Sequence, residues 1–228
     1  MINRYLLIIV LAVVTSSCEK DEVVKSDISF QTFTDSRDGN VYKTIKIGNQ
    51  IWMAENLKYL PTVSDPGIIS AEMPTYYVYG YSGTSLAGAK GSFNYGAYGV
   101  LYNWAAAKVA CPAGWHLPTN EEWIQLIDYL GGKVVSGTKL KETGIMHWQT
   151  TSPDVTNETG FTALPGGFRN FDGTFQSTGY RGYWWSATEG DDPYSAWYIH
   201  LSYNAGGLSM DSFNYVKFAG ISVRCVKD

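Results

Sequence analysis

The sequence predicts an α+β fold in which twisted antiparallel strands make up most of the chain, with one or two short helices and long loops. Three observations support this fold class. The 228 residues include 8 Trp, 17 Tyr and 24 Gly, a composition that suits strands and tight turns better than a helical bundle. One segment, which begins at Thr119, has the apolar period of an amphipathic helix. Turn-forming pairs separate β-prone stretches; they are Asp38-Gly39, Gly48-Asn49 and Asp172-Gly173.

The chain begins with a segment that is typical of export. Arg4 supplies a positive charge before the apolar run 5–14, which is about half as long as the roughly 20 residues of a membrane-spanning helix. Small residues then lead to Cys18. This arrangement resembles the lipobox of bacterial lipoproteins, although Thr15 stands where most lipoboxes carry leucine, and the resemblance implies that Cys18 is acylated. An ordinary secretory signal and an uncleaved anchor are the alternatives.

This interpretation divides the chain into three parts. We expect a lipoprotein signal peptide at 1–17, a charged tether at 18–27 that starts with the lipidated Cys18, and a single domain at 28–228. The acidic residues directly after Cys18 also resemble the surface-export signal of Bacteroidetes-type lipoproteins. The expected location is therefore the outer membrane, at the cell surface, with the lipid bilayer as a partner through the acylated Cys18.

The cysteine count agrees with a lipid anchor. The chain has three cysteines, and an odd number in an exported protein leaves one to be explained. Acylation of Cys18 explains it, so we expect Cys111 and Cys225 to form a disulfide in an oxidising compartment. Two buried free thiols are the alternative.

The first half of the domain combines a predicted meander with a long excursion. Residues 28–53 contain alternating stretches separated by two hairpin turns, which indicates a β-meander. Residues 59–99 are rich in Gly, Tyr and Ser and show no period, so we expect irregular structure there. Their many tyrosines argue against disorder, because these side chains need surface to pack on. Residues 100–110 are typical of a short helix or turn.

The segment around His116 places a histidine near carboxylates, a combination found in catalytic and metal sites. Thr119 and Glu122 nevertheless form a capping-box pattern, and apolar residues follow at i, i+3, i+4 and i+7 until Gly131-Gly132 ends the helix. No second histidine or cysteine stands at metal-ligand spacing from His116. We therefore expect a helix cap and a structural His116.

The C-terminal half predicts strands again. A hairpin is expected around Asp172-Gly173. Because neighbouring residues of a strand face opposite sides, at most one of Trp184 and Trp185 can line a shared surface. The expected strands are 182–189, 195–203 and a closing pair within 207–228.

Several long motifs carry a resemblance to a known family. They are RDGNVYKTIKIGNQIWMAENL (37–57), YGVLYNW (98–104), CPAGWHLPTNEEW (111–123), LPGGFRNFDGTF (164–175), GYWWSATE (182–189) and ISVRCVKD (221–228). Together and in this order they resemble the Fibrobacter succinogenes major paralogous domain family. The resemblance implies an exported protein or lipoprotein, and the family offers no established catalytic residues to transfer.

Two of these motifs also resemble a broader superfold. HLPTNEEW (116–123) and GISVRCVKD (220–228) are similar to segments of the C-type-lectin-like superfold that formylglycine-generating enzymes share. This resemblance implies a C-type-lectin-like domain whose long loops carry any ligand site. A shared fold does not by itself fix a function.

Exposed aromatic side chains are the first candidates for ligand contact. Aromatic faces stack on sugar rings, so we expect a surface-anchored, non-catalytic binding module for a glycan or a surface protein. The candidate residues are Tyr77, Tyr79 and Tyr81 in the 59–99 excursion, and Trp185. A core-covering loop with buried tyrosines is the alternative, as is a core position for the tryptophan.

An acidic turn offers a second set of candidates. Glu189, Asp191 and Asp192 supply carboxylates within one loop, and carboxylate oxygens are ligands for calcium. No EF-hand spacing is present, and a solvated acidic turn is the alternative. We therefore expect no cofactor, with calcium at this turn left open and the identity of any metal unknown.

Other function classes find less support. The net charge is −4 and no basic cluster follows residue 25, which argues against nucleic acid as a partner. The chain has no GxSxG or HExxH motif, and its three histidines are scattered, so we expect no enzyme activity, including that of a formylglycine-generating enzyme. A structural or adhesive subunit of a surface assembly or fimbria is the main alternative. An aromatic-walled hollow beneath the 59–99 excursion would favour ligand capture, and a filled interior would favour scaffolding.

Overall fold

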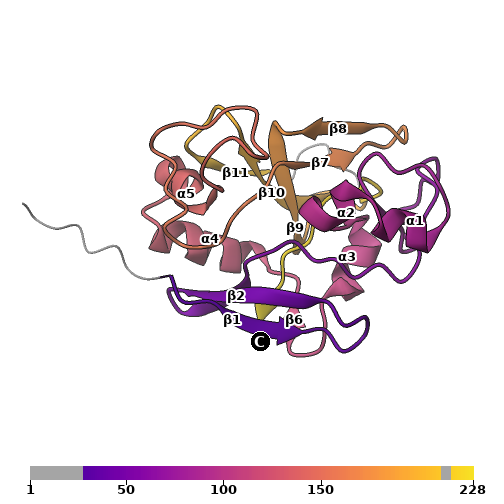
Figure 1. Cartoon of the computed structure of the whole chain (residues 1–228), viewed down its shortest axis with the longest axis horizontal. Helices are drawn as coiled ribbons and strands as arrows, with labels where there is room; N and C mark the ends of the chain where they lie inside the picture. The colour runs from indigo at the N-terminus through magenta and orange to yellow at the C-terminus, as the bar shows by residue number, and fades with distance from the viewer. Residues whose placement is uncertain (1–27, 212–216) are drawn as a thin grey trace, which may run out of the picture.

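The computed structural model describes residues 28–211 and 217–228, which Figure 1 shows in colour. The predicted signal peptide 1–17 and the tether 18–27, with Cys18, lie outside the described residues. Among the described helices, none is long and apolar enough to cross a bilayer. The described elements are β1 (Gln31–Thr34), β2 (Val41–Ile47), β3 (Gln50–Met53), β4 (Tyr76–Tyr77), α1 (Leu86–Lys90), α2 (Phe93–Tyr98), β5 (Leu101–Tyr102), α3 (Trp104–Ala110), β6 (Trp115–His116), α4 (Asn120–Tyr129), α5 (Lys133–Leu140), β7 (Gly166–Arg169), β8 (Phe175–Thr178), β9 (Arg181–Glu189), β10 (Ala196–Ser202), β11 (Leu208–Asp211) and β12 (Val226–Lys227).

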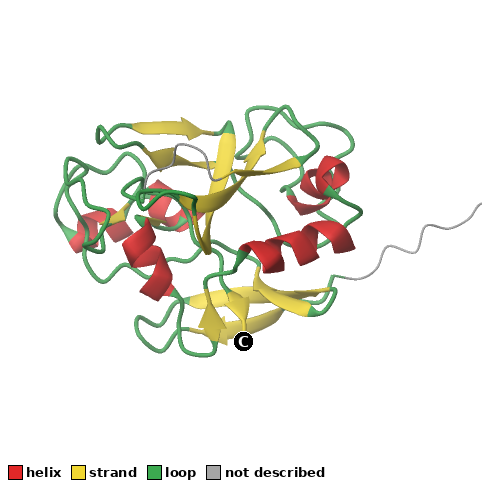
Figure 2. Ribbon diagram, turned by 180° about the vertical axis from the view of Figure 1, so that it is seen from behind, coloured by secondary structure: helices red, strands yellow, loops and turns green. Residues whose placement is uncertain are grey.

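These elements form layers. A five-stranded antiparallel sheet of order β1-β2-β3-β12-β6 lies at one side of the molecule, and β12 brings the C-terminus into the N-terminal meander. Helices α3 and α4 lie between this sheet and the three-stranded sheet β11-β10-β9 (Figures 1 and 2). The predicted mixture of antiparallel strands and short helices is confirmed. The expectation of one or two helices is wrong, because the described chain contains five short helices.

The five-stranded sheet is strongly curled. Its two edge strands are β1 and β6, yet the rings of Phe33 on β1 and Trp115 on β6 lie 5.4 Å apart between centroids. The predicted meander supplies β1, β2 and β3, and the β2–β3 turn has Gly48 at φ +60°, a conformation that glycine adopts without strain. The curl brings the two sheet edges toward each other.

Helix α4 covers the other face of this sheet. It begins as predicted, because the Thr119 hydroxyl accepts from the Glu122 N–H at 3.3 Å while the Glu122 carboxylate accepts from the Thr119 N–H at 2.8 Å. Its buried face places Trp123 against Trp52 of β3, with ring centroids 4.6 Å apart. The capping-box prediction is confirmed.

The strand β9 separates two hydrophobic clusters. Trp184 and Trp185 point to opposite faces, as the alternation of a strand requires. Trp184 packs 6.4 Å from Phe161 and donates its indole N–H to Asn56 Oδ1, whereas Trp185 donates to the carbonyl of Tyr102. Both tryptophans are core residues.

The 59–99 excursion is more ordered than the sequence predicts. It contains β4 and two short helices, each with a serine cap: the hydroxyl of Ser85 accepts from the Gly88 N–H, and that of Ser92 accepts from the Tyr95 N–H. Buried tyrosines hold these pieces on the core. The predicted absence of regular structure is therefore corrected, and buried side chains of the excursion pack in the core.

Buried cations fix the loops to the core. Arg169, Arg224 and Lys141 are all buried, and burial lowers the pKa of Lys141 to about 8 and that of Arg224 to about 9. Their partners are mostly backbone carbonyls far away in sequence, which irregular segments would otherwise leave without donors. Arg169 donates to the carbonyls of Pro66, Ile68 and Phe218, Arg224 to those of Phe161 and Thr162, and Lys141 to those of Ser202 and Ala205.

Candidate functional site

Two of the predicted ligand contacts are inside the protein. Tyr77 is 1% exposed, its ring faces the Arg169 guanidinium at 4.7 Å, and its hydroxyl donates to the Ile68 carbonyl. Trp185 is 0% exposed. The surface role predicted for Tyr77 and Trp185 is corrected, because both side chains have their polar atoms bonded within the core.

The other two predicted tyrosines, Tyr79 and Tyr81, are at the surface, and they make different contacts. Tyr81 is partly exposed and donates its hydroxyl to the Ser85 carbonyl, which ties it to the start of α1. Tyr79 is also partly exposed, but its ring lies 5.3 Å from Phe175 on the β7–β8 hairpin. Of the predicted residues, Tyr79 is therefore the one that contacts another aromatic ring at the surface.

We call two groups of rings together the aromatic strip: Tyr79 with Phe175, and Phe93 with Tyr98 and His147. Phe93 is 73% exposed and meets Tyr98 edge-on at 6.5 Å, and Tyr98 meets the imidazole of His147 edge-on at 5.7 Å. The strip thus draws on the excursion, helix α2, the loop after α5 and the β7–β8 hairpin.

A carboxylate–imidazole pair stands at one end of the aromatic strip. Both carboxylate oxygens of Glu142 lie 2.9 Å from Nδ1 of His147. The two side chains are partly exposed, at 18% and 15%, so they are held by the protein and still reached by solvent. Burial raises the pKa of the neighbouring Tyr98, and the charges of Glu142 and Tyr79 add to the rise. Tyr98 therefore stays a neutral hydroxyl at physiological pH.

Glycines let the hairpin approach the excursion closely. Gly167 has φ +65°, and a Cβ there would lie 2.3 Å from the Gln176 carbonyl oxygen and 2.9 Å from the Tyr79 ring. A Cβ on Gly166 would lie 3.3 Å from that of Tyr98. Because Gly166 and Gly167 have no side chains, Tyr98 and Tyr79 can pack directly against the backbone of β7.

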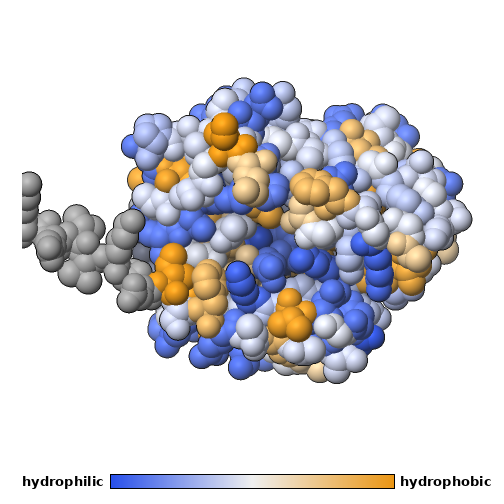
Figure 3. Space-filling view, in the orientation of Figure 1, coloured by the Kyte–Doolittle hydropathy of each residue, from blue (hydrophilic) through white to orange (hydrophobic). Residues whose placement is uncertain are grey.

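The surface around these elements is mixed in character. Figure 3 shows apolar groups that are separate from one another and surrounded by polar residues on the face that carries α2 and β8. Such a face suits a ligand that offers both apolar rings and hydrogen-bonding groups.

The carboxylates of the acidic turn do not converge on one site. Glu189 pairs with Lys217 at 3.2 Å, while Asp192 accepts from the Tyr194 N–H of its own turn at 2.8 Å. Hydrogen bonds to this turn lower the pKa of Asp192. Asp191 is exposed. Within 28–211 and 217–228 no group of three or more His, Cys, Asp or Glu side chains is placed to hold a metal ion.

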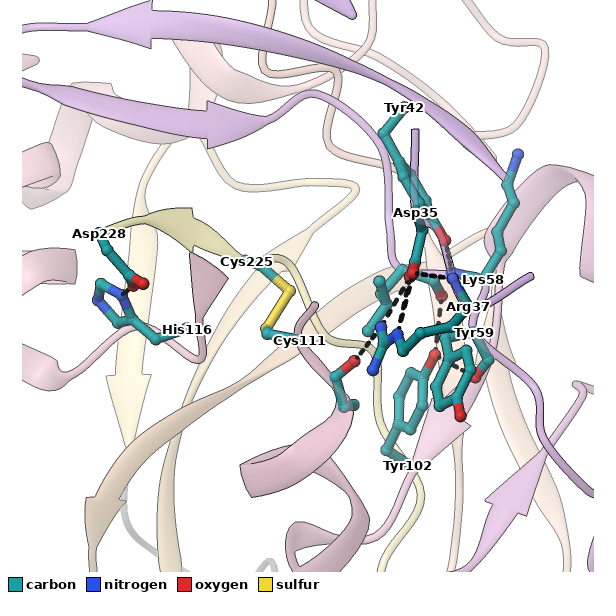
Figure 4. Close-up of a disulfide and its surroundings, with 12 residues drawn as sticks. Asp35, Arg37, Tyr42, Lys58, Tyr59, Tyr102, Cys111, His116, Cys225 and Asp228 are labelled. Carbon is teal, nitrogen blue, oxygen red and sulfur yellow. Dashed lines mark hydrogen bonds and ion pairs between the residues drawn. A yellow bond between two sulfur atoms is a disulfide. The ribbon is translucent and has the colours of Figure 1, made fainter. Parts of the chain in front are cut away.

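Figure 4 shows the disulfide and the residues around it. Cys111, directly after α3, bonds to the buried Cys225, with the two Cα atoms 5.9 Å apart. To one side of it the Arg37 guanidinium lies 3.7 Å over the ring of Tyr59, and to the other side lies His116. The predicted pairing of Cys111 with Cys225 is present in the structure.

His116 connects the C-terminal residue to helix α4. Its Nδ1 lies 2.6 Å from Asp228 and its Nε2 lies 2.7 Å from Glu122. Partial burial works against the charged ring, but the hydrogen bonds to both carboxylates outweigh it and raise the pKa of His116. His116 thus acts in an ion-pair network, in line with the structural role that the capping pattern predicts.

Sequence reasoning missed most of the strip. Phe93, Glu142, His147 and Phe175 follow no shared motif, and only the three-dimensional fold brings them together. One local signal was present: Ser92 is a helix cap, which makes Phe93 the first residue of α2.

One comparison with known proteins gives a match. The model of the Fibrobacter succinogenes major domain matches residues 45–227. Searches of curated proteins and of solved structures give no significant match.

Proposed function

The chain belongs to the Fibrobacter succinogenes major domain family, and from this premise we propose that it is a non-catalytic binding module, lipid-anchored at the bacterial surface. The observation that carries the proposal is the aromatic strip with its Glu142–His147 pair. The ligand class that it supports best is a glycan.

The chemistry of the strip suits a sugar chain. Aromatic rings bind the C–H faces of sugar rings. The carboxylate accepts hydrogen bonds from sugar hydroxyls, and an imidazole N–H donates to them. Phe93 offers most of its ring to solvent, and Tyr98 behind it is fixed in the core. A rigid aromatic surface loses little conformational entropy when a ligand binds.

The proposed fold likeness points the same way. The antiparallel sheets, few helices and long ordered loops are compatible with the C-type-lectin-like superfold, in which loops hold ligands. This likeness remains an analogy from the motifs 116–123 and 220–228, and it assigns no residue.

The proposal includes a lipid anchor at Cys18. Acylation there, followed by the tether 18–27, would place the domain at the outer membrane with the bilayer as its partner. Metabolic labelling with a tagged fatty acid tests this part: we expect the label on the wild type and none on Cys18→Ala, which should leave the membrane fraction. Label that persists in Cys18→Ala would contradict an anchor at this residue.

The disulfide favours binding over oxidase chemistry. Formylglycine-generating enzymes, as a family, use a pair of reactive cysteines, whereas Cys111 and Cys225 are bonded to each other here. Thiol titration of the unreduced protein tests the proposal, and two free thiols per mature domain would contradict it.

A glycan array with matched variants tests the binding function. We expect the wild type to bind a subset of oligosaccharides, and Phe93→Ala to weaken that binding by about tenfold, the loss of roughly 1.4 kcal/mol. Tyr194→Ala is the control, because Tyr194 is 64% exposed and lies outside the strip. His147→Gln tests the hydrogen-bonding end, and it should change which oligosaccharides bind.

Two results would contradict a glycan site on the strip. One is binding that Phe93→Ala and Tyr194→Ala weaken equally. The other is absence of binding across the array while surface proteins are bound through Phe93, which would make the ligand a protein.

An assembly subunit is the second candidate function, and two observations favour it. Buried side chains of the excursion pack in the core, and β1 is an edge strand with no charge or proline in Gln31–Thr34. Unprotected edges of this kind pair readily with other strands. Light scattering over a concentration series tests it: self-association that Thr34→Lys abolishes and Thr84→Lys preserves would support assembly, and a monomer at every concentration would contradict it.

A further inference from the structure

The concave side of the five-stranded sheet contains a cavity that is separate from the aromatic strip. Its volume is about 220 Å³, and it lies where the curl brings β1 toward β6. In Figure 1 these strands lie on the opposite side of the molecule from β8. The volume is below the range of about 300 to 1,000 Å³ that is typical for drug-sized ligands, so the cavity suits one substituted ring.

One wall of the cavity is apolar. Phe33 and Trp115 contribute rings that touch each other, and Ile51 of β3 lies beside them. The disulfide to Cys225 and the β12 pairing with β6 hold this wall in place. A flat apolar ring can therefore lie against a preformed surface.

The inner part of the cavity offers a hydroxyl group. Thr44 lines the cavity and is 4% exposed. Its hydroxyl oxygen is not one of the fully buried polar atoms that lack a partner in the described chain, so it carries no desolvation cost that a ligand must relieve. A ligand oxygen in the cavity can accept a hydrogen bond from this hydroxyl.

The charge at the cavity is positive. Lys227 lines it and forms no ion pair with any described residue, while the other lining side chains are uncharged. The next residue, Asp228, is bound to His116 at 2.6 Å. The ammonium group of Lys227 therefore gives the cavity a preference for an anion.

From these three features we propose that the cavity binds a six-membered ring that carries a carboxylate. The ring lies on the wall of Phe33, Trp115 and Ile51, and the carboxylate accepts from Lys227 and Thr44. Both an aromatic acid and a sugar acid have this chemistry. The site requires nothing of the aromatic strip, so it stands or falls independently of the proposed function.

Titration of the ¹⁵N-labelled protein, followed by NMR, tests the site with three probes: benzoate, glucuronate and glucose. We expect one or both acids to shift the amide signals of Gln31, Thr44 and Lys227, with a dissociation constant of roughly 1 mM, and glucose to shift none. Shifts with benzoate alone identify an aromatic acid, and shifts with glucuronate alone identify a sugar acid.

A matched pair of lysine variants completes the test. Lys227→Met should weaken binding of the acid by about tenfold, whereas Lys46→Met, an exposed lysine of the same sheet that does not line the cavity, should leave it unchanged. Unchanged spectra elsewhere would show that both variants fold. The proposal is overturned if neither acid shifts these signals, if glucose binds as tightly as the acids, or if Lys227→Met binds as the wild type does.

Discussion

The bond between Cys111 and Cys225 should supply a large part of the stability of the domain. It joins residues that are 114 apart, one directly after α3 and the other directly before β12. In the chain-entropy model a closed loop of this length lowers the entropy of the unfolded chain by about 16 cal/mol/K, or about 4.8 kcal/mol at 25 °C. Because typical domains are stable by about 5 to 15 kcal/mol, the protein without this bond should be only marginally folded.

Urea unfolding of the double variant Cys111→Ala/Cys225→Ala measures this contribution. We expect the free energy of unfolding to fall by about 4 to 5 kcal/mol, and the Tm to fall by about 10 to 20 °C for a domain of this size. Reductant should destabilise the wild type similarly and leave the double variant unchanged. A double variant within about 1 kcal/mol of the wild type would refute the reasoning, because it would mean that the unfolded chain gains little freedom.

Three further changes test other parts of the fold. The pKa of His116 is raised in the folded state, so its stabilisation is fully present below the unfolded pKa of about 6.5 and is lost as the pH rises through the folded pKa. This pH-dependent part of the stability is roughly 1 kcal/mol or less for exposed pairs. It should vanish from Tm measurements of His116→Gln, and its survival there would assign it to another group. Arg169→Met leaves three loop carbonyls without their donor, so urea unfolding should show a loss of about 3 kcal/mol or more, and proteases should cut near residues 65–70; an intact, protease-resistant loop would contradict this. Thr119→Ala removes the cap of α4 and should cost about 1 kcal/mol by the same assay, whereas no loss would mean that tertiary packing alone fixes the helix start.

Local patterns in the sequence predicted the elements that depend on neighbouring residues. The capping box at Thr119 and Glu122 depends on four consecutive residues, and the opposite facing of Trp184 and Trp185 depends on the alternation of one strand. The hairpin at Asp172-Gly173 likewise depends on a turn whose glycine has φ +86°. Such features require no knowledge of the rest of the chain.

Features that depend on distant partners could not be predicted. Tyr77 looked like a surface residue in an irregular tract, but β4 is covered on both sides: Tyr76 meets Tyr102 at 5.8 Å, and Tyr77 meets Arg169 at 4.7 Å. Arg169 binds carbonyls about a hundred residues away, and backbone carbonyls leave no mark in a sequence.

The aromatic strip has the same origin. Its other members lie on three segments after Tyr79, namely helix α2, the loop after α5 and the β7–β8 hairpin, and no spacing in the chain relates the Glu142–His147 pair to Phe93 or Phe175. Predicting the strip would have required knowledge of where the excursion and the hairpin lie on the core. The distance between these two segments depends on the close packing at Gly167.

The central claim is that the protein holds a glycan on the aromatic strip. A crystal structure of the protein with the oligosaccharide that it binds most tightly tests this claim most directly. We predict density for a sugar ring against Phe93 and hydroxyls within hydrogen-bonding distance of Glu142 or His147. A sugar bound elsewhere on the domain, with Phe93 exposed to solvent, would contradict it.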